Sequence, residues 1–185
     1  MAADELNIEF GPTLVRMKDG REALVRPATP EDRIGLEQMF HACSSETLFT
    51  RFLSPGLGVP LRYLNRLMEH RPPARIALIA EDEEDGEKRV VALLNFVLTE
   101  PPQKAEIAIV VVDSRQNRGL GNGMLQCLLD AARQSGIRQI IADIDAGNRR
   151  VFHLIQRSKL PARMTIDQGV AHVELELQDR GKPRR

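Results

Sequence analysis

One segment in the second half of the chain constrains the fold more than any other, because it joins a strand to a helix through glycines. Residues 105–112 are apolar and rich in β-branched side chains, which predicts a strand. A polar loop, residues 113–118, then leads into Gly119, Gly121 and Gly123, and helical spacing follows to about residue 135. The free N–H groups at such a helix start favour an anion, and glycines let the backbone approach it closely. The segment therefore predicts a site for a phosphate or pyrophosphate group.

Two other glycine-rich phosphate-binding motifs can be tested against residues 105–123. A P-loop requires Gly-Lys-Ser/Thr at its end, and this sequence is absent from the chain. A dinucleotide fingerprint requires Gly-x-Gly-x-x-Gly directly after the strand, whereas here the third glycine comes one place early and the loop is longer. Asp143 and Asp145, at the end of the next predicted strand, keep the dinucleotide alternative open. A bare Gly-x-Gly can also do no more than tighten a helix entry.

The remaining pattern predicts one α/β unit around this segment. We expect strands at 14–17, 22–26, 76–80, 90–99, 139–144 and 170–177, with a charged turn at 81–88. Helices are expected from Thr29-Pro30-Glu31-Asp32, with Ile34, Met39 and Phe40 in the core, from Ser44 or Ser45, across 60–70, and from Asn148 to about 158, ended by Pro161. We divide the chain into a flexible arm at 1–12, a domain at 13–179 and a basic tail at 180–185.

Composition excludes several classes of function. Lys plus Arg equals Asp plus Glu at 26 each, so no net charge favours nucleic acid or a membrane surface. One Tyr and no Trp leave little base-stacking surface. The two cysteines and four histidines show no disulfide framework and no metal-ligand spacing, and the N-terminus has no apolar signal region. We expect a cytoplasmic protein without a metal, and the sequence carries no signal for its oligomeric state.

The glycine segment also resembles a known family. Gln116-Asn117-Arg118-Gly119-Leu120-Gly121 matches the Gln/Arg-x-x-Gly-x-Gly/Ala signature of the GNAT acetyltransferase superfamily. Residues 26–32 and 148–160 resemble its first and fourth helices, and 44–52 resemble a segment of bacterial Pat-type protein lysine acetyltransferases. The resemblance implies a mixed α/β fold, in which helices flank a mostly antiparallel sheet, and a function in acetyl transfer from acetyl-CoA to an amine.

The resemblance also implies roles for individual residues. Main-chain groups of Ile109 and Val111 would bond the pantetheine arm of acetyl-CoA where two strands splay apart, and Asn148 would contact the same arm. The backbone amides that would cradle the pyrophosphate belong to Gln116, Asn117, Arg118, Gly119, Leu120, Gly121 and Asn122. The acceptor would be a protein lysine, slightly favoured over a small-molecule amine.

The implied chemistry needs a base, because a lysine amine with a pKa near 10.4 is free in only about one molecule in a few thousand at pH 7. Glu106 matches the glutamate of the Pat-type enzymes, and an apolar setting beside Ala108 and Val110 would raise its pKa. The N–H of Val111 would hold the oxyanion. The family's fourth-helix tyrosine, often the general acid, falls at Ile155. That departure supports an alternative function, a non-catalytic module that senses acyl-CoA.

Overall fold

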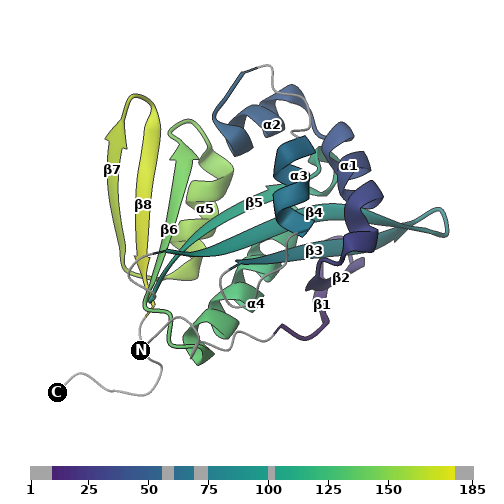
Figure 1. The fold of residues 1–185 in the computed structure, drawn as a ribbon, viewed down its shortest axis with the longest axis horizontal. Helices are drawn as coiled ribbons and strands as arrows, with labels where there is room; N and C mark the ends of the chain where they lie inside the picture. The colour runs from purple at the N-terminus through teal and green to yellow at the C-terminus, as the bar shows by residue number, and fades with distance from the viewer. Residues whose placement is uncertain (1–9, 56–60, 69–74, 100–102, 178–185) are drawn as a thin grey trace.

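The computed structural model describes residues 10–55, 61–68, 75–99 and 103–177, and within them the chain forms one mixed sheet with helices on both faces (Figure 1). Most of the predicted arm, Pro101-Pro102 and the basic tail at 180–185 lie outside the described residues. The strands are β1 Thr13–Arg16, β2 Glu22–Pro27, β3 Arg75–Glu84, β4 Glu87–Thr99, β5 Lys104–Val111, β6 Gln139–Asp145, β7 Ala162–Asp167 and β8 Val170–Glu176. The α-helices are α1 Arg33–His41, α2 Ser45–Phe52, α3 Leu61–Met68, α4 Leu120–Gln134 and α5 Arg149–Ser158.

The sheet order is β1-β2-β3-β4-β5-β6-β8-β7, and every neighbouring pair is antiparallel except β5 with β6. This is the mostly antiparallel mixed sheet expected from the sequence. Successive residues of β3 and β4, such as Ile76 to Ala80 and Val91 to Leu94, are all buried. Both faces of these central strands are therefore covered, and the core lies around them.

The charged segment at 81–88 was expected to be a turn, but β3 and β4 run through it and leave a two-residue turn at Asp85-Gly86. Both turn residues have positive φ, 54° and 78°, as hairpin turns of this length require. The acidic residues can occupy a strand because arginines bind them. Glu81 accepts hydrogen bonds from Arg26 at 2.9 Å, and Asp82 is buried against Arg115.

Two further expectations need correction. Ile34 is 68% exposed, whereas Leu36, Met39 and Phe40 form the buried stripe of α1. Two helical positions separate Ile34 from Leu36, so the two side chains point in nearly opposite directions. The other correction is β7, a strand missing from the sequence-based assignment. All six of its residues are exposed, so its sequence has no buried face that would produce an alternating pattern.

Asp32, at the start of the first helical segment, supports a pH-dependence prediction. Its carboxylate accepts hydrogen bonds from both terminal nitrogens of Arg26 at 2.7 Å and from the Thr29 amide at 2.7 Å. The Arg26 guanidinium holds the pKa of Asp32 below its usual value of 3.8. The stabilisation is therefore fully present above the unfolded pKa and is lost as pH falls through the lower, folded pKa.

We expect Asp32→Asn to lower the free energy of unfolding at pH 6 by about 1.5–3 kcal/mol, because hydrogen bonds to a charged partner are lost. The difference from the parent chain should shrink at pH 3, where the parent loses the same stabilisation. Urea unfolding of both chains at pH 6 and pH 3 measures this difference in free energy. An equal difference at the two pH values would contradict this role of Asp32.

Candidate functional site

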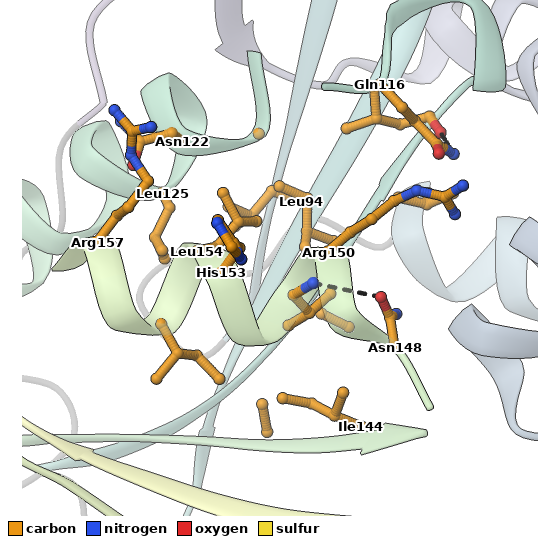
Figure 2. A pocket seen from close by; sticks show the side chains of 18 of the residues that line it. Leu94, Gln116, Asn122, Leu125, Ile144, Asn148, Arg150, His153, Leu154 and Arg157 are labelled. Carbon is orange, nitrogen blue, oxygen red and sulfur yellow. Dashed lines mark hydrogen bonds between the residues drawn. The ribbon is translucent and has the colours of Figure 1, made fainter. Parts of the chain in front are cut away.

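The site is built around a gap between β5 and β6. These parallel strands pair only at Lys104 with Gln139, Ala105 with Ile140 and Glu106 with Ile141. Beyond these three pairs β5 continues to Val111 and β6 to Asp145 without pairing to each other. A cavity of about 650 Å³ occupies the gap, with walls from both strands and from α2, α4 and α5 (Figure 2). The splayed strands expected from the family resemblance are therefore present.

The main chain of β5 offers hydrogen-bonding groups to this gap. The Val112 amide donates to Val91 O of β4 at 3.0 Å, so residues two and four places earlier on β5 also bond towards β4. Ile109 and Val111, at the alternate positions, direct their N–H and C=O groups towards the gap. The Val111 carbonyl accepts a hydrogen bond from Gln116 Nε2 at 2.9 Å. The amide of Val111 is left facing the cavity, where the sequence-based hypothesis places the oxyanion.

The loop between β5 and α4 exposes a series of backbone amides. Asn117 and Gly119 have positive φ, 60° and 94°, which turns neighbouring N–H groups towards a common side, as in anion-binding nests. The Gln116 amide donates to Asp113 O at 3.3 Å and its side chain also has protein partners. Within the described ranges, none of the amides of residues 117–122 donates to a protein acceptor. Of the seven amides predicted to hold a phosphate, that of Gln116 thus has a protein acceptor, and in the described part of the chain the other six have none.

The three glycines have different roles. A Cβ at Gly121 would meet Leu154, Ile109 and Val111 side chains at 3.5–3.8 Å, ordinary contact distances, and it would stand on the cavity wall. A Cβ at Gly123 would lie 2.2 Å from Val15 Cγ1, so this glycine allows α4 to pack against β1. Gly119, with its left-handed φ, sets the entry to the helix. The sequence-based interpretation assigned all three to the ligand, and the structure assigns Gly123 to packing.

The charge of the lining suits a polyanion. Within the described part of the chain, Asp143 is the one carboxylate that lines the cavity. The cationic residues of the lining are Arg16, Lys18, Arg51, Arg115, Arg118, Arg149, Arg150 and Arg157. Arg118 pairs with Asp19 of the β1–β2 turn, and the Arg118 carbonyl accepts from the Lys18 amide at 2.8 Å. These contacts fix the loop between β5 and α4, called the signature loop below, beside Lys18. Cations therefore flank the free amides.

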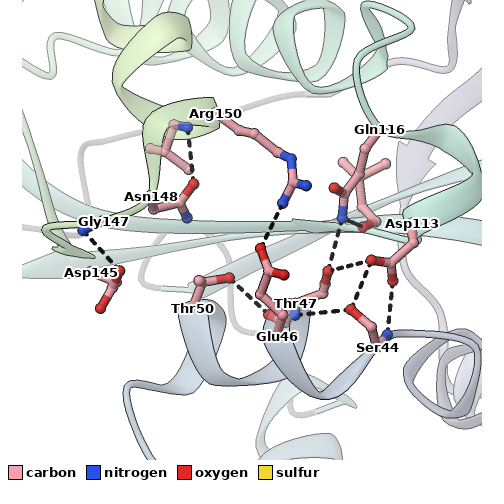
Figure 3. Close-up of polar contacts among 12 residues, drawn as sticks. Ser44, Glu46, Thr47, Thr50, Asp113, Gln116, Asp145, Gly147, Asn148 and Arg150 are labelled. Atoms are coloured by element: carbon pink, nitrogen blue, oxygen red, sulfur yellow. Dashed lines mark hydrogen bonds and ion pairs between the residues drawn. The ribbon is translucent and has the colours of Figure 1, made fainter.

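A hydrogen-bond network connects the signature loop to α2 (Figure 3). Asp113 accepts from the Ser44 amide and hydroxyl, both at 2.8 Å, and from the Thr47 hydroxyl at 2.9 Å. Gln116 Nε2 donates to the same Thr47 oxygen at 3.0 Å. Burial acts to raise the pKa of Asp113, but the hydrogen bonds from Ser44 and Thr47 outweigh it and lower that pKa, so the carboxylate stays ionised. The first residue of the signature thus holds α2 in place as well as the end of β5.

Helix α5 forms the opposite wall and contains the residues that differ from the family pattern (Figure 2). Asn148 lines the cavity and caps the helix, since its Oδ1 accepts from the Val151 amide at 3.2 Å. Ile155 lines the cavity as an aliphatic side chain. His153, interpreted from the sequence as a surface histidine, is exposed and also lines the cavity, beside arginines of the same helix. His153 stands three positions after Arg150 and four before Arg157, so the three share a helix face.

Glu106 lies where β5 and β6 still pair, at the end of the gap, and it is exposed. It shares a strand face with Ala108 and Val110, as expected, but the apolar enclosure predicted for it is absent. Val110 is buried, whereas at Glu106 the described residues leave the carboxylate open to solvent. Cys127 of α4 is partly buried, and burial raises the pKa of its thiol, which disfavours the thiolate a nucleophile needs.

Among the described residues, no three His, Cys, Asp or Glu side chains lie close enough together to hold a metal ion. In the same part of the chain, no helix combines the length and apolarity needed to cross a membrane.

Comparison with known proteins decides the family. The model of the Acetyltransferase (GNAT) family matches residues 40–158, which include α2, the signature loop and α5. The chain belongs to the GNAT acetyltransferase family. Members of this family use acetyl-CoA, and the gap, the free amides and the cationic lining of this GNAT enzyme fit such a cosubstrate.

Individual relatives agree with the assignment. A curated acetyltransferase from Pseudomonas aeruginosa is 32% identical over 138 residues, which cover 75% of this chain and 74% of the relative. The GNAT domain of S. lividans PAT has a TM-score of 0.79 at 26% identity, covering 90% of this chain and 97% of that one. YncA of Salmonella typhimurium, solved with its cofactor acetyl-CoA, shares the fold, with a TM-score of 0.64 at 20% identity over 88% of this chain and 98% of that one.

The topology of this GNAT enzyme contradicts the dinucleotide alternative. A dinucleotide-binding sheet is mostly parallel, whereas β5 and β6 are the one parallel pair in the described part of this chain. The two aspartates that kept the alternative open also have local partners. Asp143 contacts His172 at 2.7 Å, and Asp145 accepts from the Gly147 amide at 2.9 Å.

Proposed function

We propose that this GNAT enzyme binds acetyl-CoA in the gap between β5 and β6 and transfers the acetyl group to an amine in the cytoplasm. The observation that carries the proposal is the combination of splayed strands with six free amides from Asn117 to Asn122. The amides and nearby cations would hold the pyrophosphate, Ile109 and Val111 would bond the pantetheine arm, and Asn148 would contact that arm from α5. The arrangement binds the cosubstrate mainly through backbone groups.

We propose Glu106 as the general base. The acceptor amine is mostly protonated at neutral pH, so a carboxylate beside it can take the proton directly or through water. Its exposure keeps Glu106 accessible to a bulky acceptor such as a protein lysine. After deprotonation, the amine nitrogen attacks the thioester carbonyl, the Val111 N–H stabilises the oxyanion, and the carbon–sulfur bond breaks to release the CoA thiolate.

The departure at Ile155 requires no replacement acid. A CoA thiol has a pKa near 8.5, like cysteine, so the thiolate is a tolerable leaving group and can take its proton from water. The chain's one tyrosine, Tyr63, bonds to Arg51 and Asn95 rather than to a residue of α5. We favour protein lysine over a small-molecule amine as acceptor, because residues 44–52, which form helix α2 and its N-cap Ser44, resemble the Pat-type enzymes.

Calorimetric titration with acetyl-CoA tests the proposed binding site, with Gly121→Glu as the informative variant. A glutamate side chain at Gly121 would enter the cavity and place a negative charge beside the phosphate donors. We expect micromolar binding by the parent chain and at least a hundred-fold loss in the variant.

Gly11→Glu is the matched control, because a Cβ there meets nothing within 4 Å and the residue does not line the cavity. It should bind acetyl-CoA like the parent. Absence of binding by the parent chain would overturn the proposal, and so would NAD binding in place of acetyl-CoA. Binding without acetyl transfer to any amine would favour the alternative of an acyl-CoA-sensing module.

A further inference from the structure

Arg51 of α2 is a cation of the cavity whose contacts do not include a carboxylate in the described part of the chain. Its Nη2 donates to the Tyr63 hydroxyl and to Asn95 Oδ1, the latter at 2.8 Å, and both partners are neutral. The guanidinium carbon also lies 4.9 Å from the Phe52 ring centroid and 5.1 Å from that of Tyr63. Aromatic faces and neutral acceptors hold this group in position without neutralising its charge.

The donors of Arg51 are also incompletely used. Its Nε is buried, and no acceptor for it exists among the described residues. A guanidinium has five N–H donors in a rigid fork, and a carboxylate is the group that matches the fork with two parallel hydrogen bonds. Because the side chain lines the cavity, such an anion can reach it from the solvent.

The strand register places Arg51 close to the proposed base. Asn95 on β4 pairs with Ala108 on β5, and Val97 pairs with Glu106. Paired residues and those two places along a strand share a face, so Asn95 and Glu106 are diagonal neighbours, roughly 7–8 Å apart between their Cα atoms. This face is the one that α2 and α3 cover. Gly121 of α4 packs on the other face, against Ile109 and Val111.

The two groups carry opposite charges on one face of the sheet. Glu106 attracts an ammonium group, and Arg51 attracts an anion. We propose that Arg51 is a specificity-determining residue that binds a carboxylate of the acyl acceptor, so that the preferred acceptor carries both an amine and a nearby carboxylate. This inference rests on the proposed acetyl transfer and adds the chemical class of the acceptor. The carboxylate belongs either to a free amino acid or to an acidic residue beside a peptide lysine.

Competition between matched acceptors tests the proposal and distinguishes these two sources. One arm compares an α-amino acid with its α-carboxamide, and the other compares lysine peptides that have Glu or Gln beside the lysine. The arm that contains the true class of acceptor should show a kcat/KM for the carboxylate form about ten-fold or more above that for the amide form, as expected for charge-assisted hydrogen bonds. Arg51→Gln should bring that ratio close to one. Arg62→Gln, at an exposed α3 arginine outside the cavity, should keep it.

A binding measurement tests the role of Arg51 independently of whether the protein catalyses acetyl transfer. Calorimetry on the CoA-saturated parent chain compares N-acetylated forms of the same acid and amide, which require no turnover. Preference for the acid supports the role of Arg51 even if no acetyl transfer is seen, in which case the proposed function alone fails. Equal binding and equal rates for acid and amide in the parent chain overturn the inference, and so does a preference that persists in Arg51→Gln. If Arg51→Gln does not fold, Arg51→Lys retains the charge without the fork and should show a reduced ratio.

Discussion

Replacing Glu106 by glutamine is expected to lower kcat/KM for acetyl transfer about 10²- to 10⁴-fold, the usual contribution of a general base. Glutamine has nearly the same size and cannot accept the proton that the acceptor amine must lose. The affinity for acetyl-CoA should stay the same, because Glu106 does not line the cavity proposed to bind the cosubstrate. Steady-state assays of CoA release, combined with calorimetric titration, measure the two quantities.

The pH profile gives this prediction a second readout. Without a base, only amine that is already deprotonated reacts, so the rate of the variant should rise about ten-fold per pH unit up to the pKa of the amine, near 10.4 for lysine. Glu83→Gln is the matched control, since Glu83 is also an exposed glutamate in a strand and does not line the cavity. Parent-like rates in Glu106→Gln at pH 7 would remove Glu106 from the mechanism.

Replacing Arg115 by methionine is expected to lower the free energy of unfolding by about 3–5 kcal/mol, because it leaves a buried carboxylate without its counter-charge. Arg115 is 3% exposed and Asp82 is fully buried. Arg115 also pairs with Glu84 at 3.1 Å, but Glu84 is 39% exposed and water can solvate it after the change. One oxygen of Asp82 has no partner among the described residues even in the intact pair, so no local donor can take over.

The double variant Arg115→Met with Asp82→Leu separates the lost interaction from the uncompensated charge. Apolar replacement of both members of a buried ion pair is often nearly neutral for stability. We therefore expect the double variant to regain most of the stability that the single variant loses, as measured by urea unfolding of both chains. Equal destabilisation of the two would show that the cost comes from packing and not from the orphaned charge of Asp82.

The parts of the fold that the sequence predicted are those with a strong local signal. The strands predicted at 14–17 and 22–26 form the β1–β2 hairpin, and Ser44 and Asn148 marked the helix starts that their side chains cap. β7 was missed because the signal for a strand is the burial of alternate residues, and this edge strand buries none. The true lengths of β3 and β4 were hidden because acidic residues usually indicate a turn. Their partners, Arg26 and Arg115, are distant in sequence and identifiable only in three dimensions.

The candidate site divides in the same way. Backbone features followed from glycine spacing and from the family signature, and the free amides of Asn117 to Asn122 lie in the segment that these patterns indicated. Side-chain roles that depend on tertiary contacts were not. The packing of Gly123 against Val15 and the bonds from Gln116 to Thr47 join elements far apart in the sequence. Arg51 gave no signal at all, because its interest lies in the absence of a carboxylate partner among the described residues, which no linear pattern can show.

The short ladder between β5 and β6 has a consequence for folding energetics. Among the residues that the structure describes, three residue pairs at one end join β6, β8 and β7 to the rest of the sheet by strand pairing (Figure 1). A cosubstrate whose arm bonds to the edge of β5 at Ile109 and Val111 and contacts Asn148 of α5 would bridge this gap. A ligand that binds only the folded chain stabilises it by about 2.7 kcal/mol at a concentration of 100 Kd. The supply of acyl donor would then govern how long this enzyme survives unfolding and proteolysis, as well as how fast it works.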